Sequence, residues 1–262
     1  MSLYLPPWET NPKARAAAQK ALELDETLAQ AHTSLAGIKF NYDWDWKAAQ
    51  KELKRSIELN PHYAEVHDLY ATFLSAMGRH QEAIAETKRA QELDPLSLYD
   101  AGNAVWYYFL ARQHDQAIEQ GRKVLETHPN AWWTLQFTAL AYAGRGRFQE
   151  AIADSEKASH LSDSPLILAM VGGVYAIAGK KAEARKILHE LMKQSKHRYI
   201  CPYEIANVYV GLGEKDEAFK WLEKGFRDRS ICMVFLRVDP RLDPIRSAPR
   251  FQDLLRRMNC PD

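Results

Sequence analysis

Cysteine, glycine and proline are scarce in this chain of 262 residues, and each scarcity excludes a class of protein. Three cysteines, all in the last quarter, are too few for a disulfide framework and fit a reducing compartment. Twelve glycines and twelve prolines allow few turns, so the elements of secondary structure must be long. We therefore expect a cytoplasmic protein built from long elements.

A membrane-spanning run and a strong net charge are absent too. The longest apolar run, Leu166–Gly179, is too short to cross a bilayer core of ~30 Å. The first ten residues lack the basic start and apolar core of a signal peptide. Lys and Arg number 35 against 34 Asp and Glu, without the basic excess of a general nucleic-acid binder. The sequence thus predicts a soluble protein whose partner is neither a membrane nor a nucleic acid.

Self-similarity at a fixed period is the strongest positive feature. Pro61, Pro95 and Pro129 recur every 34 residues. A small residue recurs at 33 or 34 residues, at Ala49, Ala83, Ala117, Ala151, Ala184 and Ala218. A turn glycine shares this register, with an arginine replacing it in the third unit, at Gly78, Arg112, Gly146, Gly179 and Gly213. Three markers in one register indicate a tandem repeat.

Each repeat has the pattern of two helices. Apolar residues in 64–77 follow the i, i+3, i+4, i+7 spacing of a helix, and the stretch 80–93 follows it again after Gly78. Pro95 then ends the second helix. A single hairpin of this kind cannot bury its apolar face, so neighbouring units must stack. The sequence predicts an all-α solenoid of antiparallel helix pairs.

Several segments resemble the tetratricopeptide repeat family. They include LYATFLSAMGRHQEAIAETKRAQELDP (Leu69–Pro95) and IANVYVGLGEKDEAFKWLEKG (Ile205–Gly225). The resemblance covers roughly residues 11–230. It implies a right-handed superhelix that binds other proteins, without a cofactor and without enzymatic activity.

The pattern divides the chain into three regions. Residues 1–10 form a leader, 11–230 an array of one half repeat and six full repeats, and 231–262 a turn segment with a capping helix. Asn11–Asp25 reads as the second helix of a repeat whose first helix is absent. This start favours a piece of a longer protein, although a native chain that begins here stays open.

Two irregular segments also resemble the repeat regions attached to bacterial signalling proteins and transcriptional regulators. One is the turn at residues 41–46, whose Trp44 and Trp46 either form a recognition surface or, as we prefer, pack over the hairpin end. The other is the ending after Arg229, where Ala248–Met258 reads as an amphipathic helix that closes the solenoid. The resemblance implies a lost effector domain.

Residues for catalysis or metal binding do not form a recognisable set. Nine histidines are scattered without metal-ligand spacing. Gly173–Lys181 only approaches a phosphate loop, because the glycine spacing is wrong and no Ser or Thr follows. Cys201 begins a helix, where the dipole can lower a thiol pKa, but the repeat register places no His or acidic partner beside it. We expect neither an enzyme nor a bound metal or cofactor.

The concave side, lined by the first helices, is the predicted binding site. Its candidate residues come from three repeats: Tyr99, Asn103, Trp106, Phe109 and Leu110, then Trp133, Gln136, Phe137 and Leu140, then Tyr203 and Asn207. Clustered aromatic side chains usually mark an interaction site, so the predicted ligand is an apolar or aromatic protein segment. Trp106 and Trp133 can instead fill gaps between adjacent first helices.

A second hypothesis assigns the chain to a larger protein as an oligomerisation or regulatory module. The unpaired helix at Asn11–Asp25 would then dock on a second copy and form a homo-oligomer.

Overall fold

Helix pairs make up most of the protein. The structure, a computed structural model, describes residues 5–260, except for the side chains of residues 98–101. In that range α1 (Pro7–Leu24) precedes six pairs: α2 (Ala29–Ile38) with α3 (Trp46–Leu59), α4 (Ala64–Ala76) with α5 (His80–Leu93), α6 (Leu98–Leu110) with α7 (His114–Thr127), α8 (Trp132–Gly144) with α9 (Phe148–Leu161), α10 (Pro165–Ile177) with α11 (Lys181–Gln194), and α12 (Pro202–Leu212) with α13 (Lys215–Arg227). The prediction of an all-α solenoid of helix pairs is confirmed.

The turn within each pair depends on a left-handed backbone conformation. Gly213 ends α12 with a φ of +80°, which glycine adopts without a Cβ clash. Arg112 takes the same position between α6 and α7 with a φ of +60°, and its N–H donates to the Phe109 carbonyl at 2.9 Å. The third unit therefore keeps the turn, although the left-handed conformation of a non-glycine residue costs about 1 kcal/mol of conformational free energy.

Small residues set the distance between the two helices of a pair. The repeated alanine near the start of each second helix is completely buried, at Ala49, Ala83, Ala117, Ala151, Ala184 and Ala218. On a first helix, a Cβ added at Gly172 would meet Ile187 at 3.0 Å and Val208 at 3.2 Å. Close packing along the array thus explains why small side chains mark the repeat.

The turn between α2 and α3 carries an extra residue as a π-helix, η1 (Lys39–Asp43). Trp44 follows it in a left-handed conformation with a φ of 57°. Trp44 and Trp46 are only 2% and 6% exposed, so both pack inward. The preferred interpretation, that these tryptophans pack and do not form a recognition surface, agrees with the structure.

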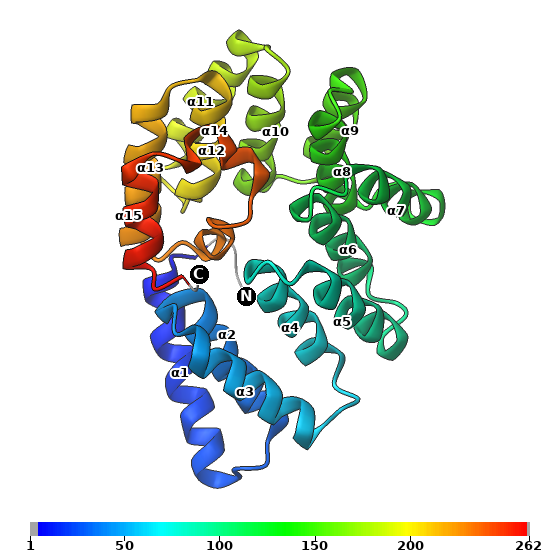
Figure 1. Ribbon diagram of the computed structural model, residues 1–262, viewed down its shortest axis with the longest axis vertical. Coiled ribbons are helices and arrows are strands. Elements are labelled where there is room, and N and C mark those ends of the chain that lie inside the picture. The colour runs from blue at the N-terminus through cyan, green and yellow to red at the C-terminus, as the bar shows by residue number, and fades with distance from the viewer. Residues whose placement is uncertain (1–4, 261–262) are drawn as a thin grey trace.

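The array curves until its last repeat meets its first, so the helix pairs form a ring (Figure 1). Trp46 of α3 donates its ring N–H to the Met258 carbonyl at 2.9 Å, in a buried contact. The Trp44 and Phe226 rings lie 5.1 Å apart, and Phe226 belongs to α13. Contacts between segments far apart in sequence therefore close the ring.

Residues 231–258, called the C-terminal segment, contain η2 (Ile231–Phe235), η3 (Pro240–Leu242), α14 (Asp243–Arg246) and α15 (Pro249–Arg257). Helix α15 lies along α13, where Arg257 pairs with Glu223 at 2.8 Å, so it caps the array as expected. The part before α15 enters the ring and contacts α12. Its side chains at Met233, Leu236 and Leu242 are completely buried.

Candidate functional site

Four of the predicted groove residues form one aromatic cluster, which comprises Trp106 and Phe109 of α6 and Trp133 and Phe137 of α8. The Trp106 ring stacks on Phe109 with centroids 5.3 Å apart and on Phe137 at 4.9 Å. Trp133 meets Phe137 edge to face at 4.6 Å. The repeat register therefore brings these rings together on neighbouring first helices.

A polar connection runs beside the aromatic cluster. The Asn103 amide donates to the Asp68 carboxylate at 2.9 Å and accepts from the Trp133 ring N–H at 3.3 Å. These bonds join α4, α6 and α8 and fix the orientation of Trp133. Rigid aromatic side chains with few rotatable bonds suit binding, because little side-chain entropy is lost.

Other predicted groove residues lie elsewhere. Gln136 is completely buried and accepts a hydrogen bond from Ser155 of α9 at 2.9 Å, so it faces its own hairpin partner and not the groove. Leu110 and Leu140 are at most 1% exposed and belong to the core. The side chain of Tyr99 lies outside the described residues.

The C-terminal segment covers the aromatic cluster. Phe235 of η2 lies edge to face on Trp106, with centroids 5.5 Å apart. The guanidinium of Arg241, in η3, lies 5.4 Å from the Trp106 ring centroid. Trp106 is consequently only 6% exposed, and Trp133 stays partly exposed. This part of the predicted groove is already filled by the chain itself.

A buried ionic network binds the same segment to α12. Arg241 contacts both oxygens of Glu204, at 2.7 and 3.0 Å, and approaches Asp239 to 2.6 Å. The Tyr203 hydroxyl donates to Asp239 at 2.8 Å. Tyr203 and Asn207, both predicted groove residues, are 0% and 2% exposed. Tyr203 therefore lies under the C-terminal segment, and neither residue lies at an open surface.

Burial governs the ionisation of this network. It raises the pKa of Glu204, against the opposing attraction of Arg241. It also raises the pKa of Tyr203 far above its usual range. The side chains of Arg241, Glu204 and Asp239 are 4%, 6% and 0% exposed, so removing one charge would leave its partner uncompensated in the interior.

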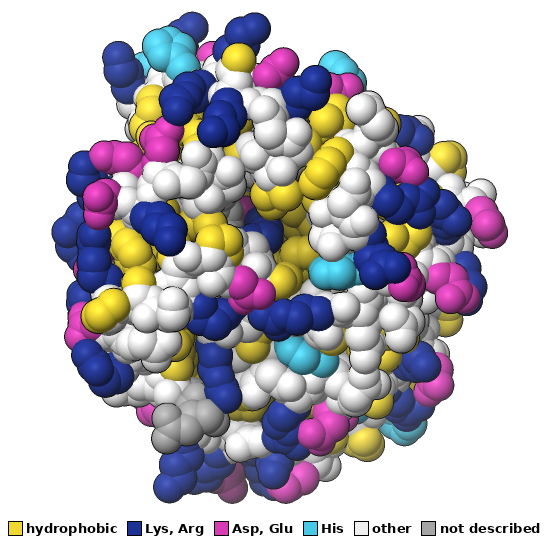
Figure 2. Space-filling model, turned by 45° about the horizontal axis from the view of Figure 1, so that its top comes forward, with side chains coloured by type: hydrophobic (Ala, Val, Ile, Leu, Met, Phe, Trp, Pro, Cys, Tyr) yellow, Lys and Arg dark blue, Asp and Glu magenta, His cyan; other side chains and the backbone are white. Residues whose placement is uncertain are grey.

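Two openings remain near this filled region. Figure 2 shows a hollow in the middle of one face, with hydrophobic side chains around it. A cleft of about 800 Å³ lies where the first repeat meets the C-terminal segment, and residues of both charges line it, including Asp45, Lys47 and Arg79. Because acidic and basic residues line the cleft together, its charge favours neither an anionic nor a cationic ligand.

Clusters of side chains that could bind a metal ion are absent from residues 5–260. No three or more His, Cys, Asp or Glu side chains there come together as a metal site. Within the same range, no helix has the length and apolar character needed to cross a membrane. Cys201 has a partner that the repeat register did not indicate, because its sulfur lies 3.4 Å from that of Cys232 in η2.

Comparison with known proteins agrees with the fold. A tetratricopeptide repeat family model matches residues 203–227. Human tetratricopeptide repeat protein 13 is 32% identical over 108 residues, which cover 41% of this chain and 12% of that protein. The chain thus spans a small part of this relative.

Two solved structures resemble the ring. The crystal structure of the APC/C hetero-tetramer Cut9-Hcn1 gives a TM-score of 0.62 at 15% identity, over 95% of this chain and 46% of that chain. The type IV pilus biogenesis factor PilW gives 0.54 at 14% identity, over 87% of this chain and 98% of that chain. At these identities the likeness concerns the fold alone.

Proposed function

We propose that the chain binds a protein segment without catalysing a reaction. A tetratricopeptide repeat family model matches residues 203–227, and the fold resembles that of tetratricopeptide repeat proteins, which commonly serve as protein-interaction scaffolds. The binding surface is the part of the concave side around the aromatic cluster on α6 and α8. The ligand is an apolar or aromatic segment, because aromatic rings and not paired charges form this surface.

The observation that carries this proposal is the contact between the chain's own Phe235 and Trp106. An aromatic side chain from a non-repeat segment already lies on the cluster, so the surface can hold a peptide of that kind. Trp133 extends the same surface and remains partly exposed beside the covered part. Its ring is fixed by Asn103, so it offers a rigid contact next to the segment already bound.

A random-peptide library displayed on phage tests the proposal. We expect enriched peptides to contain an aromatic residue, and Trp133→Ala to weaken their affinity at least ~10-fold, as for a hot-spot residue. Phe148→Ala is the matched control, because Phe148 is an exposed aromatic residue on α9, the second helix of the same pair. Circular dichroism checks that both variants keep their helices. Unchanged affinity in Trp133→Ala would exclude this surface.

A second candidate function is self-association through α1. Leu24 and Trp8 of this helix are 78% and 47% exposed, and large apolar side chains at a surface favour an interface. Sedimentation velocity distinguishes the two outcomes: we expect a concentration-dependent dimer if α1 is an interface. A monomer at every concentration would contradict it.

We also propose a cytoplasmic location and a place in a larger bacterial signalling protein. The free thiols of Cys201, Cys232 and Cys260 support the first, since reducing compartments keep thiols free. The place in a signalling protein is supported by the turn at residues 41–46 and by the ending after Arg229. Both resemble the repeat regions attached to bacterial signalling proteins. The sequence flanking this chain in its gene tests the second directly.

A further inference from the structure

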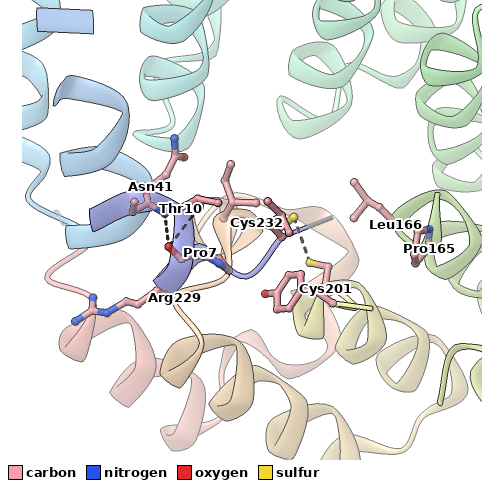
Figure 3. A pocket seen from close by; sticks show the side chains of 12 residues that line it. Pro7, Thr10, Asn41, Pro165, Leu166, Cys201, Arg229 and Cys232 are labelled. Atoms are coloured by element: carbon pink, nitrogen blue, oxygen red, sulfur yellow. Dashed lines mark hydrogen bonds between the residues drawn. The ribbon is translucent and has the colours of Figure 1, made fainter. Parts of the chain in front are cut away.

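Two of the three cysteines are in contact where the C-terminal segment meets α12. The Cys201 sulfur lies 3.4 Å from the Cys232 sulfur (Figure 3). It also lies 3.3 Å from the Ser230 hydroxyl. Cys201 directly precedes α12, and Cys232 lies in η2. A disulfide requires two cysteines that the fold already holds close together, and these sulfurs meet that requirement.

A small cavity gives access to both sulfurs. Its volume is about 30 Å³, which is enough for a molecule of the size of water or hydrogen peroxide. Asn11 and Tyr199 also line it, and the side-chain amide oxygen of Asn11 lacks a hydrogen-bond partner among the described residues. The cavity therefore offers a small polar molecule a hydrogen-bond acceptor beside a pair of thiols.

The two thiols differ in their environment. Hydrogen bonding to Cys232, with a further contribution from Ser230, lowers the pKa of Cys201 against the effect of burial. The neighbouring Cys201 raises the pKa of Cys232. The lowered pKa favours the thiolate, which is the reactive form, on Cys201. The Cys232 sulfur, 3.4 Å away, is within reach for a second step.

We propose that Cys201 and Cys232 form a reversible disulfide with hydrogen peroxide as oxidant. The Cys201 thiolate attacks one peroxide oxygen, and the O–O bond breaks. Hydroxide leaves, and Cys201 becomes a sulfenic acid. The Cys232 sulfur then attacks the Cys201 sulfur, and the lost hydroxyl group and the Cys232 proton leave as water. Each thiol loses one electron, and the peroxide gains two.

The bond would fasten the C-terminal segment to α12. Cys232 lies three residues before Phe235 in the same short helix, and Phe235 covers Trp106. A disulfide at this point restrains the segment inside the ring, and a cellular thiol reductant releases it. Intracellular disulfides of this type are usually transient and redox-sensing.

The test is oxidation of the full-length folded chain with hydrogen peroxide, followed by intact mass and non-reducing peptide mapping. We expect loss of two hydrogen atoms, a peptide that joins Cys201 to Cys232, and a Tm higher by roughly 5 °C, all reversed by dithiothreitol. Cys201→Ser and Cys232→Ser should each abolish the loss of two hydrogen atoms and the joined peptide. Cys260→Ser is the control, because burial raises the pKa of Cys260 to about 12 and keeps it unreactive.

Two results would overturn the proposal. One is full alkylation of both Cys201 and Cys232 after peroxide treatment of the folded protein. The other is a cross-link that involves Cys260 as readily as the expected pair, which would indicate disulfide formation in unfolded chains. Peptide binding by the Trp133 surface is measured separately, so failure of either proposal is recognisable without the other.

Discussion

The C-terminal segment contacts the concave side in two regions that use different chemistry. On α12 it is bound by the charges of Glu204, Asp239 and Arg241, in nearly complete burial. On α6 and α8 it is bound by aromatic rings around Trp106, beside which Trp133 remains partly exposed. The same segment therefore has one ionic and one aromatic attachment.

The difference separates anchoring of the segment from recognition of a ligand. A buried ion pair tolerates little change, because each charge depends on its partner for compensation. Aromatic surfaces adapt to many apolar groups and usually keep part of their affinity when a ligand changes. We therefore assign anchoring of the C-terminal segment inside the ring to the α12 contact, and binding of other segments to the aromatic contact.

The largest expected effect comes from removing the central charge of the ionic attachment. Arg241→Ala leaves Glu204 and Asp239 buried without a cation and should reduce the free energy of unfolding by about 3–5 kcal/mol. Urea unfolding measures it. The control is Arg256→Ala on α15, whose pair with Asp253 is exposed and screened by solvent, so its loss should leave stability nearly unchanged. Equal stability of the two variants would mean that the ionic attachment does not anchor the C-terminal segment.

Conservative substitutions in the two attachments sharpen the comparison. Arg241→Lys keeps the charge but loses the two-pronged contact with Glu204, and should reduce the free energy of unfolding by about 2 kcal/mol. Trp106→Phe keeps an aromatic ring and should lose only about 1 kcal/mol. The same urea experiment compares them. A larger loss for Trp106→Phe would reverse the assignment of the two regions.

The smallest effect is a pH dependence outside both attachments, between α4 and α5. His67 faces the Glu86 carboxylate at 2.7 Å and the Pro61 carbonyl at 3.1 Å, so both ring nitrogens must carry protons. Hydrogen bonding to Glu86 raises the pKa of His67 above its ordinary value. The protonated ring thus stabilises the fold fully below pH ~6.5, and this contribution is lost as pH rises through the raised pKa.

Comparison of His67→Gln with the parent chain across pH measures this contribution. We expect the variant to be less stable by about 1 kcal/mol at low pH and the difference to shrink as pH increases. His189→Gln, at an exposed position on α11, should show no such trend. A stability difference that grows with pH would contradict a protonated His67.

Local patterns in the sequence were sufficient to predict the helix pairs. The 34-residue register predicted where small residues lie between the helices. Gly78 and Gly213 lie at the predicted turns, where both adopt a left-handed conformation. Arg112 adopts the same conformation without being glycine, so the register, more than the residue type, carried the information. The aromatic cluster followed from the same register, because equivalent positions on neighbouring first helices lie side by side.

The position of the C-terminal segment could not be predicted in this way. Residues after Arg229 have left the repeat register, and their apolar residues fit an outer cap as well as an inner filling. The contact between Arg241 and Glu204 joins positions 37 residues apart with no period to reveal it. Gln136 was misplaced for a related reason, since helical spacing alone does not tell a groove position from one that faces α9.

The C-terminal segment lies in the concave side of the chain's own ring, against Trp106 and α12. Hydrogen–deuterium exchange of the amides in residues 233–246 measures whether it stays there, because exchange reports how often a segment opens. We expect these amides to exchange as slowly as those of α12, to which the segment is bound. Exchange at the rate of an unstructured peptide, with α12 still protected, would show that the segment lies outside the ring.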